Sequence, residues 1–456
     1  MRPLLGTELL APLDLAFWHL ESDAHPMHLG ALAVFTPAPG TTPPHILDLL
    51  RTRAAAIPRL RMCVRDVLLP VGGAAWTVDK DFDVHRHVRR VAVEDGDFMA
   101  GATRLAGELM EQPLGRGVPP WQMYLIGGAD DGPFAVLVKL HHALADGMRA
   151  VAIGAGIFDE IAAATARPVT RGRPAVPPRS WLPDPREMAG MALGRIGEVG
   201  RALGVGASVV RAGRLDLRST AFTAPSSGTR RLATADLDAT ALQRIRRAEG
   251  STANDILLAV VAGALRRWMA GRGEAPATDP RALVPVSRRR PGGGVNGNRL
   301  SAYLLDLPVG AADPRERLRT VRAAMDRNKA AGPLKGAGAV AVLADQLHPL
   351  AHRFGAPLAA NAARMLFDLL VTSVPLPRTA LSLGGCPLSA LYPMAPLARG
   401  QSLAVALSTY GGRVHVGLVA DGKALADLER LAAAVEEEFE ELRELVTGGR
   451  VPAPVL

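Results

Sequence analysis

The stretch Phe134–Ala150, FAVLVKLHHALADGMRA, decides the fold of this chain more clearly than any other. It opens with the short apolar run Phe134–Leu140, which has the length and composition of a buried strand. His141 and His142 follow directly. Histidine suits proton abstraction near neutral pH, because its unperturbed pKa lies there. The pattern therefore predicts two imidazoles at the end of a buried strand, where a rigid scaffold can present a base to a substrate.

The residues after the histidines predict a tight turn into a helix. Three residues separate His142 from Asp146 and Gly147, and an amphipathic stretch then runs over Met148–Ile161. Asp146 can cap that helix, because a short acidic side chain accepts hydrogen bonds from the first helical N–H groups. The complete pattern is HHxxxDG, and it is specific in this strand-to-helix setting.

This pattern resembles the catalytic motif of CoA-dependent acyltransferases with the chloramphenicol-acetyltransferase-like fold. The similarity to the bacterial wax ester synthase/diacylglycerol acyltransferase family extends along nearly the whole chain. Segments similar to those of that family follow in the expected order at Pro12–Phe35, Pro58–Arg61, Asp81–Val88, Gly250–Trp268, Arg281–Arg289, Gly297–Pro308 and Tyr392–Asp421. These ordered matches carry more weight than the histidine motif alone.

The resemblance implies an α/β fold of two chloramphenicol-acetyltransferase-like domains, with mixed sheets flanked by helices and an active-site tunnel between them. A length of 456 residues also suggests two domains. Proline and arginine are dense over 166–185, which excludes regular helix or central strand there. We therefore expect an N-terminal acyltransferase domain over 1–165, a linker and crossing helix over 166–228, and a C-terminal acyltransferase domain over 229–456.

Periodicity predicts further elements on both sides of this linker. Gly411-Gly412 indicates a hairpin turn. The predicted strands are Leu29–Phe35, Ala75–Val78, Arg281–Val286, Leu300–Leu307, Leu403–Tyr410 and Arg413–Val419. The predicted helices are Pro44–Ala56, Phe98–Met110, Ala253–Ala270, Ala424–Val446 and a weakly amphipathic Arg186–Ala212, which is either a packed helix or a cover over a lipid tunnel.

The resemblance also implies roles for the motif residues. His142, the second histidine, is the expected general base, and His141 is expected to shape the site. Asp146 would hold the loop, and Gly147 would leave room for a backbone or an acyl chain. No covalent intermediate is needed, because CoA is already a good leaving group.

Five further residues are candidates for substrate binding. Asn254 and Asp255 match the family's Asn-Asp signature, although capping of the helix after Ser251-Thr252 explains them equally well. The other three are weaker candidates that could equally satisfy a strand or a turn, and they are Asn298, Gln401 and Ser408.

Composition excludes several other classes of protein. The formal net charge is +9, but aromatic residues make up only 4% and no nucleic-acid motif is present. The charge fits an anionic membrane surface, the phosphates of CoA or a genomic bias toward arginine, and charge alone does not separate these three. The histidine pairs His85/His87 and His348/His352 lack the further ligands of a metal site. The sequence predicts no cofactor and no metal, with acyl-CoA as co-substrate.

The same reading predicts where the protein acts. No stretch reaches the length of about 18 apolar residues that a spanning helix requires, and no secretory signal is evident. We expect a cytoplasmic protein that associates peripherally with the inner membrane or with lipid inclusions.

The implied reaction is transfer of a long-chain acyl group from acyl-CoA to the hydroxyl of diacylglycerol or of a fatty alcohol. Two segments depart from the family pattern: Pro119–Trp121 replaces Pro-Leu-Trp, and Ser373–Pro377 replaces Asn-Val-Pro-Gly-Pro. Alternatives are a same-fold transferase for a polyketide, glycolipid or carrier-bound acceptor, a non-catalytic lipid-binding protein, and an esterase that uses water.

Overall fold

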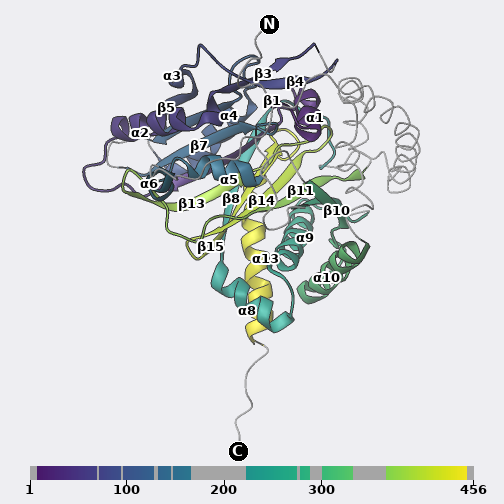
Figure 1. Ribbon diagram of the computed structural model, residues 1–456. Helices are drawn as coiled ribbons and strands as arrows, with labels where there is room; N and C mark the ends of the chain where they lie inside the picture. The colour runs from purple at the N-terminus through teal and green to yellow at the C-terminus, as the bar shows by residue number, and fades with distance from the viewer. Residues whose placement is uncertain are drawn as a thin grey trace, which may run out of the picture.

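The protein is described by a computed structural model in which two six-stranded sheets organise the chain (Figure 1). The structure describes residues 8–68, 71–93, 96–127, 132–144, 147–165, 222–274, 278–287, 300–331 and 366–448. The predicted linker 166–185 and the predicted helix Arg186–Ala212 lie outside these ranges.

The first sheet carries the histidine motif. Its strand order is β12-β13-β2-β7-β6-β5, antiparallel except for the parallel pair β5/β6. All eight residues of β7 are buried, because both faces of this central strand are covered, which explains its continuous apolar run. The strands are β2 (His28–Phe35), β5 (Val88–Ala92), β6 (Trp121–Gly127), β7 (Phe134–His141), β12 (Ser382–Leu383) and β13 (Cys386–Met394).

The second sheet has the order β10-β9-β11-β14-β15-β8 and mixes parallel with antiparallel pairs. Gly411 and Gly412 join β14 to β15 with φ of 57° and 79°, which confirms the predicted hairpin turn. The strands are β8 (Arg230–Asp238), β9 (Arg281–Ser287), β10 (Leu300–Asp306), β11 (Leu369–Val374), β14 (Leu403–Tyr410) and β15 (Arg413–Asp421).

One strand from late in the chain joins the two sheets. β13 pairs with β2 in the first sheet, with Leu391 opposite Ala33. It also lies directly on β15, because a Cβ added at Gly417 would come 2.0 Å from the Pro393 carbonyl oxygen. The division into residues 1–165 and 229–456 did not foresee this exchange, since pairing between distant strands leaves no local signal in the sequence.

Helices cover the outer faces of both sheets. α9, α8 and α13 pack on the second sheet, while α1 and α2 lie by the first sheet (Figure 1). A small sheet of β1, β4 and β3 stands beside α1 (Figure 1). These elements are β1 (Glu8–Leu9), α1 (Pro12–Leu20), α2 (Pro43–Ala56), η1 (Pro58–Arg61), β3 (Met62–Asp66), β4 (Ala74–Val78), α3 (Val84–His87), α4 (Phe98–Glu111), α5 (Gly147–Ala155), α6 (Asp159–Thr165), α8 (Ala239–Glu249), α9 (Ala253–Gly271), α10 (Pro314–Ala331) and α13 (Leu428–Gly448).

The helix predicted over Met148–Ile161 was wrong as a single element. The structure has two helices, α5 and α6, with a turn at 156–158. Gly156 sits against Ile57, where a Cβ would come 2.9 Å from the Ile57 side chain, and Arg53 donates to the Ile157 carbonyl oxygen at 2.5 Å. Tertiary contacts therefore divide a stretch whose local pattern favours one helix. Within the described ranges, no helix is long and apolar enough to cross a membrane.

Candidate active site

The two histidines lie on a turn that main-chain hydrogen bonds hold from both sides. His141 is the last residue of β7, and its N–H donates to the Pro120 carbonyl oxygen at 3.0 Å. The N–H of His142 donates to the Met27 carbonyl oxygen at 2.8 Å, and the Leu144 N–H donates back to the His141 carbonyl oxygen at 2.9 Å. The predicted position of the histidines at the end of a buried strand is confirmed.

The imidazole of His142 is half-buried and stacks on Phe17 of α1. The ring centroids are 3.9 Å apart, with 24° between the planes. Stacking fixes the ring through its face and does not use its two nitrogens, which lie in the ring plane. His142 is therefore oriented by packing at a position that retains partial exposure.

The imidazole of His141 is fully buried and has a different environment. The Ala143 N–H donates to its Nδ1 at 2.9 Å, and the edge of Trp18 lies 5.0 Å away between centroids. Burial lowers the pKa of His141 to about 3, so the ring is neutral near pH 7. Because Nδ1 accepts a hydrogen bond, the single ring proton must lie on Nε2.

Glu21 is an acidic residue beside these histidines, and no local pattern in the sequence distinguishes it. Its Oε1 lies 3.4 Å from His141 Nε2 and 3.5 Å from His28 Nε2, and its Oε2 lies 2.9 Å from Arg116. Burial raises the pKa of Glu21, but its contacts with His28, His141 and Arg116 outweigh this effect and the net shift is downward. The carboxylate is therefore ionised near pH 7.

Arg116 connects this carboxylate to the aromatic wall of the site. Its guanidinium lies 4.1 Å from the Trp18 ring centroid and donates to the Trp18 carbonyl oxygen at 3.2 Å. A cation over an indole face adds to the stability of the arrangement. The only sequence signal for Glu21 was its place in the family-like segment Pro12–Phe35. No local pattern predicts its contacts with Arg116 and His141, which lie 95 and 120 positions further along the chain.

Lys139 is a second buried titratable residue near the histidines. It lies two residues before His141 on β7, and therefore on the same face of the sheet. Its Nζ donates to the Leu109 carbonyl oxygen at 2.7 Å and to that of Gln112, at the C-terminal end of α4. Burial lowers the pKa of Lys139 to about 7, against an opposing effect of Glu21. The ammonium satisfies the last carbonyls of a helix, which is a structural role.

The structure describes some of the other predicted site residues and not others. Gly147 begins α5, whereas Asp146 and Asn298 lie outside the described residues. Asp255 is buried in a capping box: its Oδ2 accepts from the Thr252 N–H at 3.0 Å, and its own N–H donates to Thr252 Oγ1 at 3.2 Å. Capping is thus an observed role for Asp255, and its part in substrate binding stays a prediction.

Asn254 meets one of the segments that depart from the family pattern. Its Oδ1 accepts from Ser373 Oγ of β11 at 3.4 Å, and α5 packs against the same strand. The helix after the histidines and the start of α9 therefore converge on β11. The Ser373–Pro377 departure is structurally coupled to the Asn-Asp signature.

Gln401 and Ser408 are buried and have main-chain partners. Gln401 Nε2 donates to the Phe367 carbonyl oxygen at 3.4 Å, and Ser408 Oγ donates to that of Leu391 at 2.7 Å. These bonds satisfy both side chains within the fold. Their contribution to the substrate channel remains a prediction.

The second departure, at Pro119–Trp121, adjoins the histidine turn. Besides the Pro120–His141 bond, Trp121 Nε1 donates to the Leu60 carbonyl oxygen at 2.6 Å, and the indole stacks on His87 at 4.6 Å. His87 Nδ1 lies 2.8 Å from the Trp121 carbonyl oxygen, so this imidazole has a structural role. In the part of the chain that the structure describes, no three metal-ligating side chains gather as a metal site.

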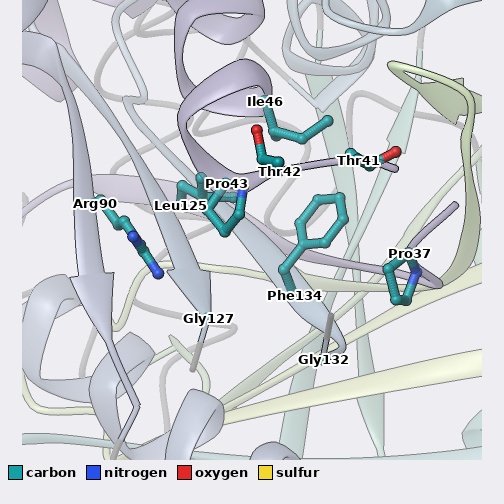
Figure 2. Close-up of a pocket in the computed structure, with 10 residues that line it drawn as sticks. All are labelled: Pro37, Thr41, Thr42, Pro43, Ile46, Arg90, Leu125, Gly127, Gly132 and Phe134. Atoms are coloured by element: carbon teal, nitrogen blue, oxygen red, sulfur yellow. The ribbon is translucent and has the colours of Figure 1, made fainter. Parts of the chain in front are cut away.

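Figure 2 shows a pocket beside Phe134, the first residue of β7. Phe134, Leu125 and Ile46 line it together with Thr42 at the start of α2. Phe134 and His141 are the two ends of β7, about 23 Å apart at the rise of a strand. The pocket is therefore not part of the histidine site, and the tunnel between the two halves stays a prediction.

Comparisons with known proteins identify the family of this chain. The family model of the wax ester synthase/diacylglycerol acyltransferase catalytic domain matches residues 10–257, and that of the WS/DGAT C-terminal domain matches residues 296–443. A protein from Mycobacterium tuberculosis named probable diacylglycerol O-acyltransferase is 32% identical, with 94% of each chain covered. A second protein of that name and organism is 29% identical over 96% of this chain and 99% of its own.

Two solved structures share the fold. The wax ester synthase/diacylglycerol acyltransferase from Marinobacter aquaeolei is 23% identical with a TM-score of 0.70, over 96% of this chain and 100% of its own. The first condensation domain of the CDA synthetase is 17% identical with a TM-score of 0.60, over 97% of each chain.

Fold and comparisons together define the class as an acyltransferase built from two mixed α/β halves. Within that class, the chain belongs to the wax ester synthase/diacylglycerol acyltransferase family.

Proposed function

We propose that this protein transfers a long-chain acyl group from acyl-CoA to the hydroxyl of diacylglycerol or of a fatty alcohol. The names of its relatives support the reaction, and the histidine turn supports the chemistry. The observation that carries the proposal is the contrast within the HHxxxDG motif: His141 is enclosed and neutral, whereas the adjacent His142 is half-buried and oriented by Phe17.

His142 is the general base of the proposed mechanism. It takes the proton of the acceptor hydroxyl while that oxygen attacks the thioester carbonyl carbon. The tetrahedral intermediate then collapses, the C–S bond breaks, and the imidazolium returns the proton to the departing thiolate. The products are the ester and free CoA thiol, so atoms and charge balance without a covalent enzyme intermediate and without a cofactor.

Free CoA thiol released from palmitoyl-CoA tests this proposal directly. The purified full chain is assayed with diolein, with hexadecanol or without acceptor, beside His142→Ala and a control His45→Ala on the exposed surface of α2. We expect acceptor-dependent release that His142→Ala abolishes and His45→Ala retains. Equal release without an acceptor would indicate hydrolysis of the thioester instead, and binding without release would indicate a lipid-binding protein.

We also propose that the protein works at a lipid surface, because such acceptors are not dissolved in water. Exposed apolar side chains on and around the small sheet support this: Leu68 is 92% exposed, and Val71 and Leu9 are about half exposed at 53% and 55%. The Gly72 carbonyl oxygen, just before β4, lies 3.4 Å from His19 Nε2, so this part of the β3–β4 connection adjoins α1, which also carries Phe17.

Flotation with phospholipid vesicles tests the lipid surface. The double substitution Leu68→Ser with Val71→Ser should reduce co-flotation, whereas Leu445→Ser, which removes an exposed leucine from α13, should not. Equal flotation of all three proteins would contradict a role of the hairpin.

A further inference from the structure

We propose that Glu21 is a positioning residue for His142, and that it acts through the ring of His141. This inference rests on the proposed function, in which His142 is the general base. It adds a residue outside the HHxxxDG motif and assigns the first histidine a defined task. The contacts run from the fixed carboxylate to the His141 ring, and from that ring to the turn that carries His142.

The first step is the attachment of the carboxylate. Glu21 Oε2 is held by Arg116 at 2.9 Å, and Arg116 is itself fixed by the ring and the carbonyl oxygen of Trp18. The Glu21 side chain is only 8% exposed. A buried carboxylate fixed at one oxygen presents the other oxygen, Oε1, in a defined direction.

The second step is the tautomer of His141. Oε1 lies 3.4 Å from His141 Nε2, and the ring is completely buried. A carboxylate oxygen at this place favours the tautomer with the proton on Nε2, because N–H and carboxylate attract each other while a nitrogen lone pair would be repelled. His28 Nε2 reaches the same oxygen from the neighbouring strand, at 3.5 Å.

The third step is the turn that carries His142. With the proton on Nε2, Nδ1 of His141 has the lone pair that accepts the Ala143 N–H at 2.9 Å. The Leu144 N–H bonds the His141 carbonyl oxygen, so the two residues after His142 are both held by His141. The opposite tautomer would set an N–H against the Ala143 N–H and loosen the segment on which the base sits.

Substitutions that mimic one ring nitrogen at a time test this chain of contacts. Asn at position 141 keeps an acceptor at the place of Nδ1 but has no group at Nε2, and Gln keeps a donor near Nε2 but has no acceptor at Nδ1. These variants are compared with Glu21→Gln, which keeps the size of Glu21 and removes its charge. The full chain is assayed for kcat and for KM of palmitoyl-CoA.

We expect Glu21→Gln and His141→Gln to lower kcat by about tenfold or more while KM changes by less than about threefold, the pattern of a misplaced base. His141→Asn should retain more kcat than His141→Gln, because it keeps the Nδ1 acceptor that holds the turn. Equal losses in the two histidine variants, or full kcat in Glu21→Gln, would overturn the proposal.

A matched control separates positioning from loss of a buried ion pair. Glu438→Gln removes the carboxylate of another buried arginine pair, Arg317–Glu438, which joins α10 to α13 in the second half. We expect it to lower the melting temperature and to leave the kcat of the folded fraction unchanged. A loss of kcat as large as in Glu21→Gln would mean that general destabilisation explains both.

The nitrogen shifts of His141 give a readout that does not depend on activity. In protein labelled with ¹⁵N-histidine and assigned with His141→Asn, the Nε2–H tautomer should be seen in the wild type and lost or mixed in Glu21→Gln. An unchanged tautomer would overturn the second step. If His142→Ala were active, the proposed function would fail, whereas an inactive His142→Ala beside a fully active Glu21→Gln would refute only the positioning role.

Discussion

The two six-stranded sheets each bury a histidine beside a carboxylate, but in different places along the strand. His141 ends β7 and faces Glu21 from 3.4 Å, with a half-buried His142 next in the chain. His415 is the third residue of β15, and its Nδ1 lies 2.5 Å from Asp236 of β8. Tyr392 of β13 donates to the same carboxylate at 2.8 Å.

This difference shows that a buried histidine–carboxylate pair does not by itself define an active site. His415 is buried inside the second sheet, and its ring lies 5.3 Å between centroids from that of Tyr392 on β13, so its contacts join the two sheets. At the end of β7 the chain leaves the sheet, so the residue after the buried histidine reaches the surface of the site. Position along the strand, rather than the residue pair, separates the enclosed His415 from the half-buried His142 that we propose as the base.

Removal of the proposed base should give the largest loss of kcat, and it tests directly whether His142 and His415 differ in function. We expect His142→Ala to lower kcat by about 10²- to 10⁴-fold, the usual contribution of general base catalysis. His415→Asn should lower stability and leave the kcat of the folded protein within about threefold, because the contacts described for His415 are with Asp236 and Tyr392 inside the fold. Steady-state kinetics and thermal unfolding of both variants test this expectation. Comparable losses of kcat in His142→Ala and His415→Asn would contradict the distinction between the two histidines.

The contact between the two sheets should not tolerate a side chain at Gly417. A methyl group there would come 2.0 Å from the Pro393 carbonyl oxygen, so β13 and β15 would have to separate. We expect Gly417→Ala to cost about 1–3 kcal/mol of unfolding free energy, measured by urea denaturation. Gly271→Ala at the end of α9, where a Cβ meets nothing within 4 Å, is the control that should be neutral or stabilising.

Acid should destabilise the protein through the histidine cluster of the first sheet. Burial lowers the pKa of His141 to about 3 and also lowers that of His28, so the unfolded chain binds protons first as pH falls below about 6.5. The contribution of these neutral histidines to the unfolding free energy is fully present above about pH 6.5 and is lost as the pH falls toward 3. The loss is about 1.4 kcal/mol per pH unit for each histidine that stays neutral in the folded protein. The unfolding free energy, measured with urea at pH 7, 6 and 5, should fall less steeply with decreasing pH in His141→Asn than in the wild type. The same pH dependence in both proteins would refute this account.

Ser408 should give the smallest effect. Ser408→Ala leaves the Leu391 carbonyl oxygen without its 2.7 Å donor, so we expect a loss of about 1 kcal/mol in unfolding free energy with unchanged KM. A clear rise in KM for either substrate would instead support its predicted role in the channel.

Local patterns predicted much of the fold. The apolar runs of β7, β14 and β15, the double-glycine hairpin and the buried helix α9 with its capping box are all present. Such features depend on neighbouring residues, so they can be read without the fold. The break between α5 and α6 could not be predicted, because Ile57 and Arg53 impose it from another helix and its following loop.

The sequence by itself determined the motif and its strand-to-helix setting, because these depend on neighbouring residues. It also determined the mixed α/β class, through the resemblance carried by short family-like segments and their order along the chain. Only the tertiary structure decided that β13 crosses into the first sheet and that Glu21 and Arg116 meet His141. It also decided that, of two adjacent histidines, one is enclosed and neutral and the other half-buried. Burial and long-range pairing depend on which distant segments pack together, and that information is absent from any local stretch of the chain.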